Sequence, residues 1–233
     1  MSTHWPLQTE SLVHRFRPVL LAMIIGLALA GCGGGGGDDG GAPNPPAPPP
    51  PPPPSGVPPL SANAINISGG QQIGVDRWSP GNTSTGGNGQ AVGGIECLPT
   101  MPDNYHVHSH VAVFLNGQQL SVPNDVGIVS TGSTPCFYTI HTHDKSGKIH
   151  VEAAQQGTFT LGQLFDIWGQ PLSSSDVAGL SGMSVKIYVT DNGTVTEAAT
   201  ATWRDIELRS HRLITIVVGT AITEIPNYTW SGN

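Results

Sequence analysis

The chain is poor in positive charge and in cysteine, and both shortages exclude classes of partner. Its 233 residues include nine lysines and arginines against sixteen aspartates and glutamates, which gives a formal net charge of −7. Such a chain is not attracted to nucleic acid or to an anionic membrane surface, so we expect no nucleic-acid partner. Its three cysteines form no Cys-x-x-Cys pair, the spacing that is typical of thiolate metal sites.

Long apolar runs are also lacking. The run Val19 to Ala30 has twelve residues, and it is too short and ends too abruptly for a membrane span. Arg15 and Arg17 precede it, as in a secretory signal peptide. The sequence therefore predicts an exported protein rather than one that crosses the membrane with a helix.

The apolar run closes on Leu29-Ala30-Gly31-Cys32, which resembles the bacterial lipobox, where the cysteine is lipidated. This resemblance implies a lipoprotein of the cell envelope, held to the membrane by a lipid on Cys32. Gly33 follows, where an aspartate would favour inner-membrane retention, so the outer membrane is the expected location. The alternative is an ordinary signal peptide with a chance cysteine.

The composition divides the chain into four parts. Residues 1–31 are the expected lipoprotein signal peptide, and residues 32–60 form a Gly/Pro-rich tether with seven consecutive prolines at Pro48 to Pro54. Polyproline II rises about 3.1 Å per residue and makes a semi-rigid spacer; an SH3-type ligand is the alternative. Residues 61–93 are rich in Gly, Ser and Asn, and we expect a loosely ordered lead-in. Residues 94–233 are long enough for a single globular domain.

Two cysteines remain after lipidation of Cys32. They are Cys97 and Cys136, and each lies just upstream of a group of histidines. In an oxidising compartment two leftover cysteines usually pair, so we predict a Cys97–Cys136 disulfide. Thiolate ligation of a soft metal is the alternative.

Six of the nine histidines lie between residues 106 and 150. The first group, His106, His108 and His110, leads into a hairpin with an Asn116-Gly117 turn. Alternate residues of a strand point to the same face, so these three histidines share the face opposite the apolar side chains of this hairpin. We therefore expect them to line the non-core face of a sheet.

The second group repeats the arrangement over two short β-type runs, Phe137–His143 and Lys148–Ala153. A loop of two or four residues sorts the apolar side chains onto one face, whereas a loop of three residues mixes the faces. A one-residue slip turns every side chain over, so the apolar pattern should select the sorted register. The opposite face then carries His141, His143, His150 and Glu152.

Clustered imidazoles indicate metal coordination, because imidazole is the commonest protein ligand of transition metals. His106 and His110 lie about 13 Å apart along a strand, so one ion takes at most an adjacent pair from each strand. We predict a single copper or zinc site with two histidines from the first group and two or three ligands from the second. The surplus side chains and Asp144 would support these ligands or form a second site. Hydrogen bonding or proton buffering by the histidines is the alternative.

The rest of the domain has structural signals. Thr160 and Gln163 form a capping box ahead of a short amphipathic helix that ends at Gly169, and strands are expected over 185–190, 194–200 and 213–218. We predict an α+β fold, mostly antiparallel β with one short helix and β-grasp-like in order. An all-β cupredoxin-like sandwich is the alternative.

Several of these motifs together resemble an uncharacterised family of exported bacterial and archaeal proteins. The resemblance covers most of residues 94 to 230, and it implies the domain boundary and the importance of the histidines without implying an activity. The motifs are Gly94-Ile95-Glu96-Cys97, Tyr105-His106-Val107-His108-Ser109-His110, Asn116-Gly117, His141-Thr142-His143-Asp144, Gly147, Ile149-His150-Val151-Glu152 and Phe159 to Gly169.

The pattern favours a protein that binds copper or zinc for sensing, buffering or delivery. The chain has no His-Glu-x-x-His, Gly-x-Ser-x-Gly or phosphate-binding glycine loop, so no known catalytic motif points to an enzyme. Glu152 or Asp144 beside a metal-bound water could act as a general base. A metal-dependent hydrolase and a structural lipoprotein without metal therefore stay open as alternatives.

Overall fold

The computed structural model describes residues 56–81, 83, 85–130 and 135–231. The predicted signal peptide, the predicted lipidation site Cys32 and most of the expected tether lie outside these residues. Within the described part, no helix is both long enough and apolar enough to cross a membrane.

The described residues are mostly β-strand. In chain order the strands and helices are β1 (Leu60–Ile67), β2 (Cys97–Leu98), β3 (Tyr105–Leu115), β4 (Gln118–Leu120), β5 (Ile128–Val129), β6 (Cys136–Tyr138), β7 (Ile140–His141), β8 (Lys148–Ala153), α1 (Leu161–Trp168), β9 (Asp176–Val177), β10 (Leu180–Ser181), β11 (Val185–Asp191), β12 (Thr194–Glu197), the 3-10 helix η1 (Thr200–Asp205), β13 (Leu213–Val218) and β14 (Ile225–Trp230).

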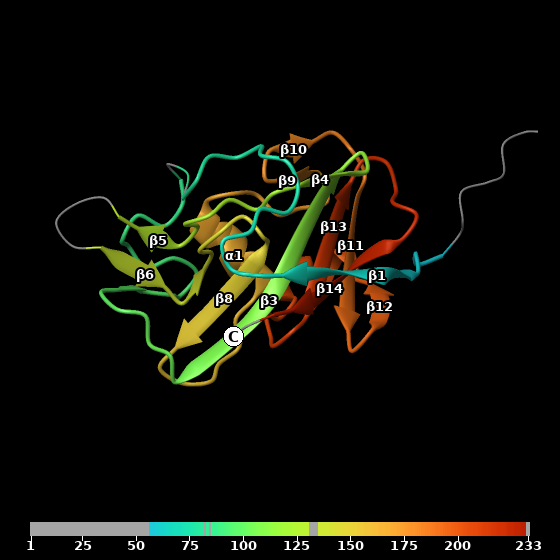
Figure 1. Cartoon of the computed structure of the whole chain (residues 1–233). Helices are drawn as coiled ribbons and strands as arrows, with labels where there is room; N and C mark the ends of the chain where they lie inside the picture. Colours follow the sequence, from blue (N-terminus) through green and yellow to red (C-terminus); the bar gives the residue numbers. More distant parts are fainter. Residues whose placement is uncertain (1–55, 82, 84, 131–134, 232–233) are drawn as a thin grey trace, which may run out of the picture. The chain divides into compact units, whose positions relative to one another are not determined.

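Among the described residues the largest sheet has seven strands, in the order β12-β11-β13-β3-β8-β7 with β4 also paired to β3 (Figure 1). The pairs are antiparallel except at the centre, where β13 runs parallel to β3. The β13 sequence Leu-Ile-Thr-Ile-Val-Val is rich in β-branched residues and is buried along its whole length, as expected of a central strand. The expected α+β class fits this arrangement, but neither a β-grasp nor a cupredoxin fold is established.

The two hairpins have the registers that the sequence predicts. At the first turn both Asn116 and Gly117 have positive φ, of 49° and 84°, and β3 pairs with β4 directly across it. These are the angles of a type I′ turn. In the second hairpin Ile140 lies opposite Val151 and His141 opposite His150. This is the sorted register, with a loop of four residues.

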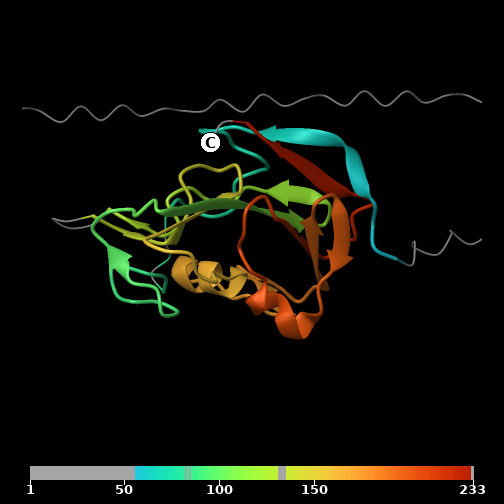
Figure 2. The same ribbon diagram turned by 90° about the horizontal axis from the view of Figure 1, so that it is seen from below.

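One face of the seven-stranded sheet packs against α1. Thr160 and Gln163 form the predicted capping box, and Gly169 ends the helix in the left-handed conformation. The buried residues of α1 belong to the same core cluster as Val111 and Ile149 of the sheet. Figure 2 shows α1 and η1 on this side of the sheet, while β1 and β14 lie across the other side.

Within the described part of residues 61–93, for which we expect a loosely ordered lead-in, the structure has one strand, the part of β1 that ends at Ile67. Strand β1 pairs in parallel with β14, and this two-stranded ribbon buries Ile67, Tyr228 and Ala112 in a second apolar cluster. Five of the eight residues of β1 are exposed, so this strand buries few side chains of its own. Its order comes from a strand far away in the chain and from a few buried anchors.

Cys97 and Cys136 form a disulfide. It joins β2 to β6 in a separate three-stranded sheet, ordered β2-β6-β5. Strand β7 begins two residues after β6 ends. The cross-link therefore lies next to one of the histidine-bearing strands, and the loop that it closes contains β3.

Candidate metal centre

Three adjacent strands bring the two histidine groups together. Across β3 and β8, His106 lies opposite Glu152 and His108 opposite His150. Across β8 and β7, His150 lies opposite His141. Neighbouring strands are about 4.8 Å apart, so His108, His150 and His141 form one row on one face of the sheet. We call the resulting cluster the histidine centre; its members among the described residues are His106, His108, His141, His143, His150 and Glu152.

The donor atoms of the histidine centre lie at the separations found between ligands of one ion. The Nε2 atoms of His106 and His108 are 3.0 Å apart, and those of His141 and His143 are 3.2 Å apart. The Nδ1 atom of His150 lies 3.3 Å from Glu152 Oε1. Metal–nitrogen bonds of 2.0–2.1 Å in a tetrahedral site place neighbouring ligand atoms about 3.3–3.4 Å apart. The geometry therefore fits a transition-metal site.

Hydrogen bonds between the rings cannot satisfy all of the close nitrogen–nitrogen contacts in the histidine centre. His108 Nε2 lies 3.0 Å from His106 Nε2 and 3.1 Å from His150 Nδ1. A ring nitrogen carries either one proton or one lone pair, so a single proton on His108 Nε2 serves only one of the two neighbours. A cation at this point is instead faced by the lone pairs of all three rings.

The backbone selects the ligand atom of His141. Its Nδ1 donates a hydrogen bond to the carbonyl oxygen of Tyr138, at 2.9 Å, so the Nε2 atom keeps its lone pair. This Nε2 points to His143 and to Glu152 Oε1, which is 3.7 Å away. Metal-binding histidines commonly donate their second ring N–H to a carbonyl or carboxylate in this way.

Burial keeps two of the rings in the neutral form that binds metal. Desolvation lowers the pKa of His141 to about 4, although the hydrogen bond to Tyr138 opposes the shift. Desolvation and the neighbouring rings, first His108 and then His143, lower the pKa of His150 to about 2. At neutral pH both rings therefore carry lone pairs rather than charge.

The histidine centre is buried at its middle and open at its rim. His141 has no exposed side-chain surface, and the side chain of Glu152 is 10% exposed. In contrast, His106 and His143 are exposed. An ion can therefore reach the buried donors from solvent past either of these two rings.

The third histidine of the first group lies apart from the centre. His110 is fully buried under the ribbon, with its ring 3.8 Å from that of Tyr228. Its Nε2 donates to the carbonyl of Ser146 at 2.8 Å, and its Nδ1 has no hydrogen-bond partner. The strand spacing places His110 on the predicted face, but β14 covers that part of the face.

Asp144 has a different place from the one expected. Its carboxylate accepts hydrogen bonds from the backbone N–H of Ser146, at 2.9 Å, and of Gly70, at 2.8 Å. Asp144 therefore shapes the turn between β7 and β8 and ties the lead-in to it, and the structure gives it no hydrogen bond to a ring of the histidine centre.

One aromatic neighbour of the histidine centre was not predicted from the sequence. The ring of Trp230, at the end of β14, stacks on the ring of His108 with centroids 6.2 Å apart. The ring of His211 also contacts Trp230, with centroids 5.1 Å apart. Trp230 lies more than a hundred residues from His108 in the chain, so only the fold could bring them together.

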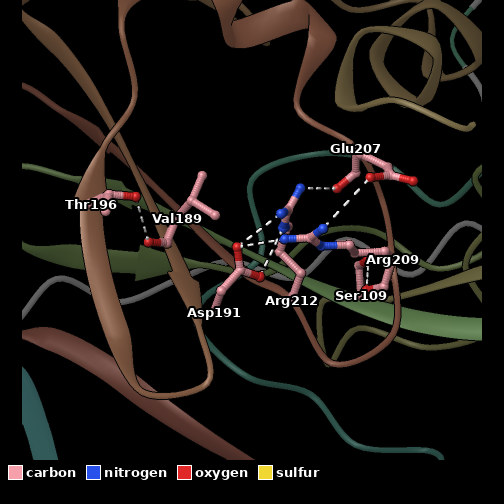
Figure 3. Close-up of polar contacts among 7 residues, drawn as sticks. All are labelled: Ser109, Val189, Asp191, Thr196, Glu207, Arg209 and Arg212. Carbon is pink, nitrogen blue, oxygen red and sulfur yellow. Dashed lines mark hydrogen bonds and ion pairs between the residues drawn. The ribbon is translucent and has the colours of Figure 1, made fainter.

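A network of ion pairs and hydrogen bonds holds Arg209 to Arg212, the segment just before β13, next to β3 (Figure 3). Arg212 donates to both carboxylate oxygens of Asp191, at 2.9 and 2.8 Å, and Arg209 donates to the same carboxylate at 3.0 Å. The hydroxyl of Ser109 donates to the carbonyl of Arg209 at 2.8 Å. The backbone N–H of His211, which lies between the two arginines, donates to the carbonyl of His108 at 2.7 Å. The network therefore holds the β3 backbone at His108 and Ser109, and His108 belongs to the histidine centre.

The chain matches no family model, and it has no match among curated proteins or solved structures. The resemblance to the exported family therefore stays a prediction from the motifs.

Proposed function

We propose that this chain is an envelope lipoprotein whose domain binds a divalent transition metal, copper or zinc, for sensing, buffering or delivery. The observation that carries the proposal is the meeting of five imidazoles and one carboxylate, from three strands and one turn of the described domain. Four pairs of donor atoms are 3.0–3.3 Å apart, and a contact of 3.7 Å between His141 and Glu152 joins the two groups.

The donor set supports copper or zinc over harder ions. Imidazole nitrogen suits zinc and copper, whereas magnesium and calcium take mainly oxygen ligands. Only Glu152 offers oxygen in the histidine centre. The set contains no thiolate, because Cys97 and Cys136 are joined in the disulfide.

Two features support the envelope location. The lipobox-like sequence ends at Cys32, and a structural disulfide joins the other two cysteines. Disulfides persist in oxidising compartments such as the bacterial periplasm and are rare in the cytosol. A lipid on Cys32 would then hold the metal-binding domain at the membrane through the tether.

The position of Glu152 favours binding over hydrolysis. Its Oε1 atom lies 3.2 Å from His106 Nε2, 3.3 Å from His150 Nδ1 and 3.7 Å from His141 Nε2. A general base needs a free lone pair directed at a reacting water. An oxygen surrounded by three ring nitrogens is instead placed as a metal ligand, so we favour a binding protein over an enzyme.

The test is calorimetric titration of the metal-free full chain with Zn²⁺ and Cu²⁺, beside elemental analysis of protein purified from its own cell envelope. We expect bound copper or zinc and a dissociation constant tighter than micromolar. His141→Ala should weaken binding strongly. His211→Asn is the matched control, since His211 is exposed and outside the histidine centre and asparagine tolerates its positive φ of 58°. Wild-type binding weaker than micromolar for both ions would overturn the proposal.

A further inference from the structure

The histidine centre has more donor atoms than one ion uses. Six side chains converge, whereas zinc in protein sites usually takes four ligands. Two ligands on opposite sides of one ion can be at most about 4.1 Å apart when each bond is 2.0–2.1 Å. The centre also spans three strands, β3, β8 and β7, so its outer rings start from backbones about 9.6 Å apart.

The donor atoms fall into two overlapping groups. His141, His143, His150 and Glu152 form one, and His106, His108 and His150 form the other; within each group all donors lie within 4.8 Å of one another. His106 and His108 share no group with His141 and His143. One ion therefore serves either pair of rings but is badly placed for both.

The donors can be sorted into two sets of three, with Glu152 counted in the second set although it also contacts the first. His106, His108 and His150 are linked by nitrogen separations of 3.0 and 3.1 Å. The Nε2 atoms of His141 and His143 are 3.2 Å apart, and the Glu152 oxygen lies 3.7 Å from His141. Each set supplies three ligands, so a four-coordinate ion in either set would take a water molecule or another small ligand in its fourth position.

Glu152 lies between the two sets. Its Oε1 is 3.2 Å from His106 Nε2 and 3.3 Å from His150 Nδ1 on one side, and 3.7 Å from His141 Nε2 on the other. An ionised carboxylate has two oxygens and about four lone-pair sites, so it can bind two ions at once. Paired ions in protein sites lie about 3.5–4 Å apart.

Each set also has its own opening to solvent. His106, whose side chain is 39% exposed, belongs to one set, and the exposed His143 belongs to the other. The buried rings His108 and His141 lie behind them, each in contact with its exposed partner. Two ions could therefore enter independently.

We propose that the histidine centre holds two transition-metal ions side by side, one on His141, His143 and Glu152 and the other on His106, His108 and His150, with Glu152 as the bridge. This inference rests on the proposed function, because it concerns the same centre. It adds a second ion and assigns each histidine to one of the two.

The experiment measures how many ions each variant binds. The full chain is stripped of metal and dialysed against Zn²⁺, and bound zinc per chain is measured by elemental analysis. We expect two ions for the wild type, and one each for His106→Ala and His143→Ala, because each variant loses one ligand of one set. His211→Asn should keep both ions. The substituted rings are exposed members of their sets, so the folded structure should survive, and circular dichroism checks that it does.

A second readout tests the bridge. With two equivalents of Cu²⁺, the bridged wild-type centre should give an electron paramagnetic resonance spectrum of coupled ions, with its intensity reduced or split. His106→Ala and His143→Ala, each with one ion, should give the full spectrum of an isolated Cu²⁺. Glu152→Gln should lose or reduce the coupling.

The outcomes separate this inference from the proposed function. One zinc per wild-type chain, lost equally in His106→Ala and His143→Ala, would overturn the two-ion centre and leave metal binding in place. No bound zinc or copper would overturn both. Two ions that persist in His106→Ala, or that show no coupling with Cu²⁺, would place the second ion elsewhere and also overturn the inference.

Discussion

The disulfide between Cys97 and Cys136 should supply much of the stability of the domain without determining the geometry of the histidine centre. The two cysteines are 39 residues apart in the chain. By the chain-entropy relation, closing a loop of that length destabilises the unfolded state by about 4 kcal/mol. Folded domains are stable by only about 5–15 kcal/mol, so loss of the cross-link should remove a large part of the free energy of unfolding.

The histidine centre should tolerate that loss while the protein stays folded. Its register comes from the hydrogen bonds of β3, β8 and β7, none of which involves the disulfide. The two cysteines are partly buried against the core beneath these strands, but that core is made mainly of other side chains. We therefore expect metal affinity to change by less than tenfold when both cysteines are replaced.

Urea unfolding of the metal-free full chain and of the Cys97→Ser/Cys136→Ser double variant measures the effect. At a slope of about 2 kcal/mol per molar urea, a loss of about 4 kcal/mol lowers the midpoint by about 2 M. The double variant is required because a single free thiolate is itself a copper or zinc ligand. A midpoint shift under 0.5 M would refute the entropic estimate, and a large fall in zinc affinity at low urea would refute the independence of the centre.

Three further results are expected. Cys32→Ala should abolish fatty-acid labelling and membrane fractionation, and unchanged membrane association would remove the lipid anchor. Thr160→Ala should lower the free energy of unfolding by about 1 kcal/mol, because the capping box at the start of α1 is lost; an unchanged urea midpoint would argue that the cap adds nothing. Burial lowers the pKa of His110 to about 4, below the value of about 6.5 in an unfolded chain. Between these values the unfolded state binds more protons, so the stabilising contribution is full above pH 6.5 and declines as the pH falls toward 4. The metal-free protein should lose about 2–3 kcal/mol from this group between pH 7 and pH 4.5, and His110→Phe, unfolded in urea with chelator, should lose correspondingly less; an equal loss in both would mean that another group titrates.

The sequence was informative wherever a local signal decided the structure. The Asn116-Gly117 pair predicted a type I′ turn, and the structure has the positive φ angles that this turn needs. In the second hairpin a loop of two or four residues puts Ile140 and Val151 on one face, and the structure has the loop of four residues. The Thr160 capping box and Gly169 likewise marked both ends of α1. Each of these features depends on residues within about ten positions of one another.

Pairings between distant segments were not predictable in the same way. The alternation of His106, His108 and His110 shows that they share a face, but it does not show what covers that face. The ribbon of β1 and β14 covers His110, whereas His106 and His108 belong to the histidine centre. Strand β1 was not predicted either, because it is ordered by pairing with β14, near the other end of the domain.

The placement of the histidine centre on a sheet bears on how it would use a metal. In many small metal-binding domains the ligands lie on loops that order only when the ion binds, so the metal is part of the folding energy. Here five of the six candidate ligands stand on β3, β8 and β7, which are paired to one another and backed by the apolar core, and His143 lies in the turn after β7. If the proposed ion binds here, the fold itself would hold most of the donors, and release of the ion would leave the sheet intact. Such a site suits reversible uptake and delivery better than a permanent structural metal.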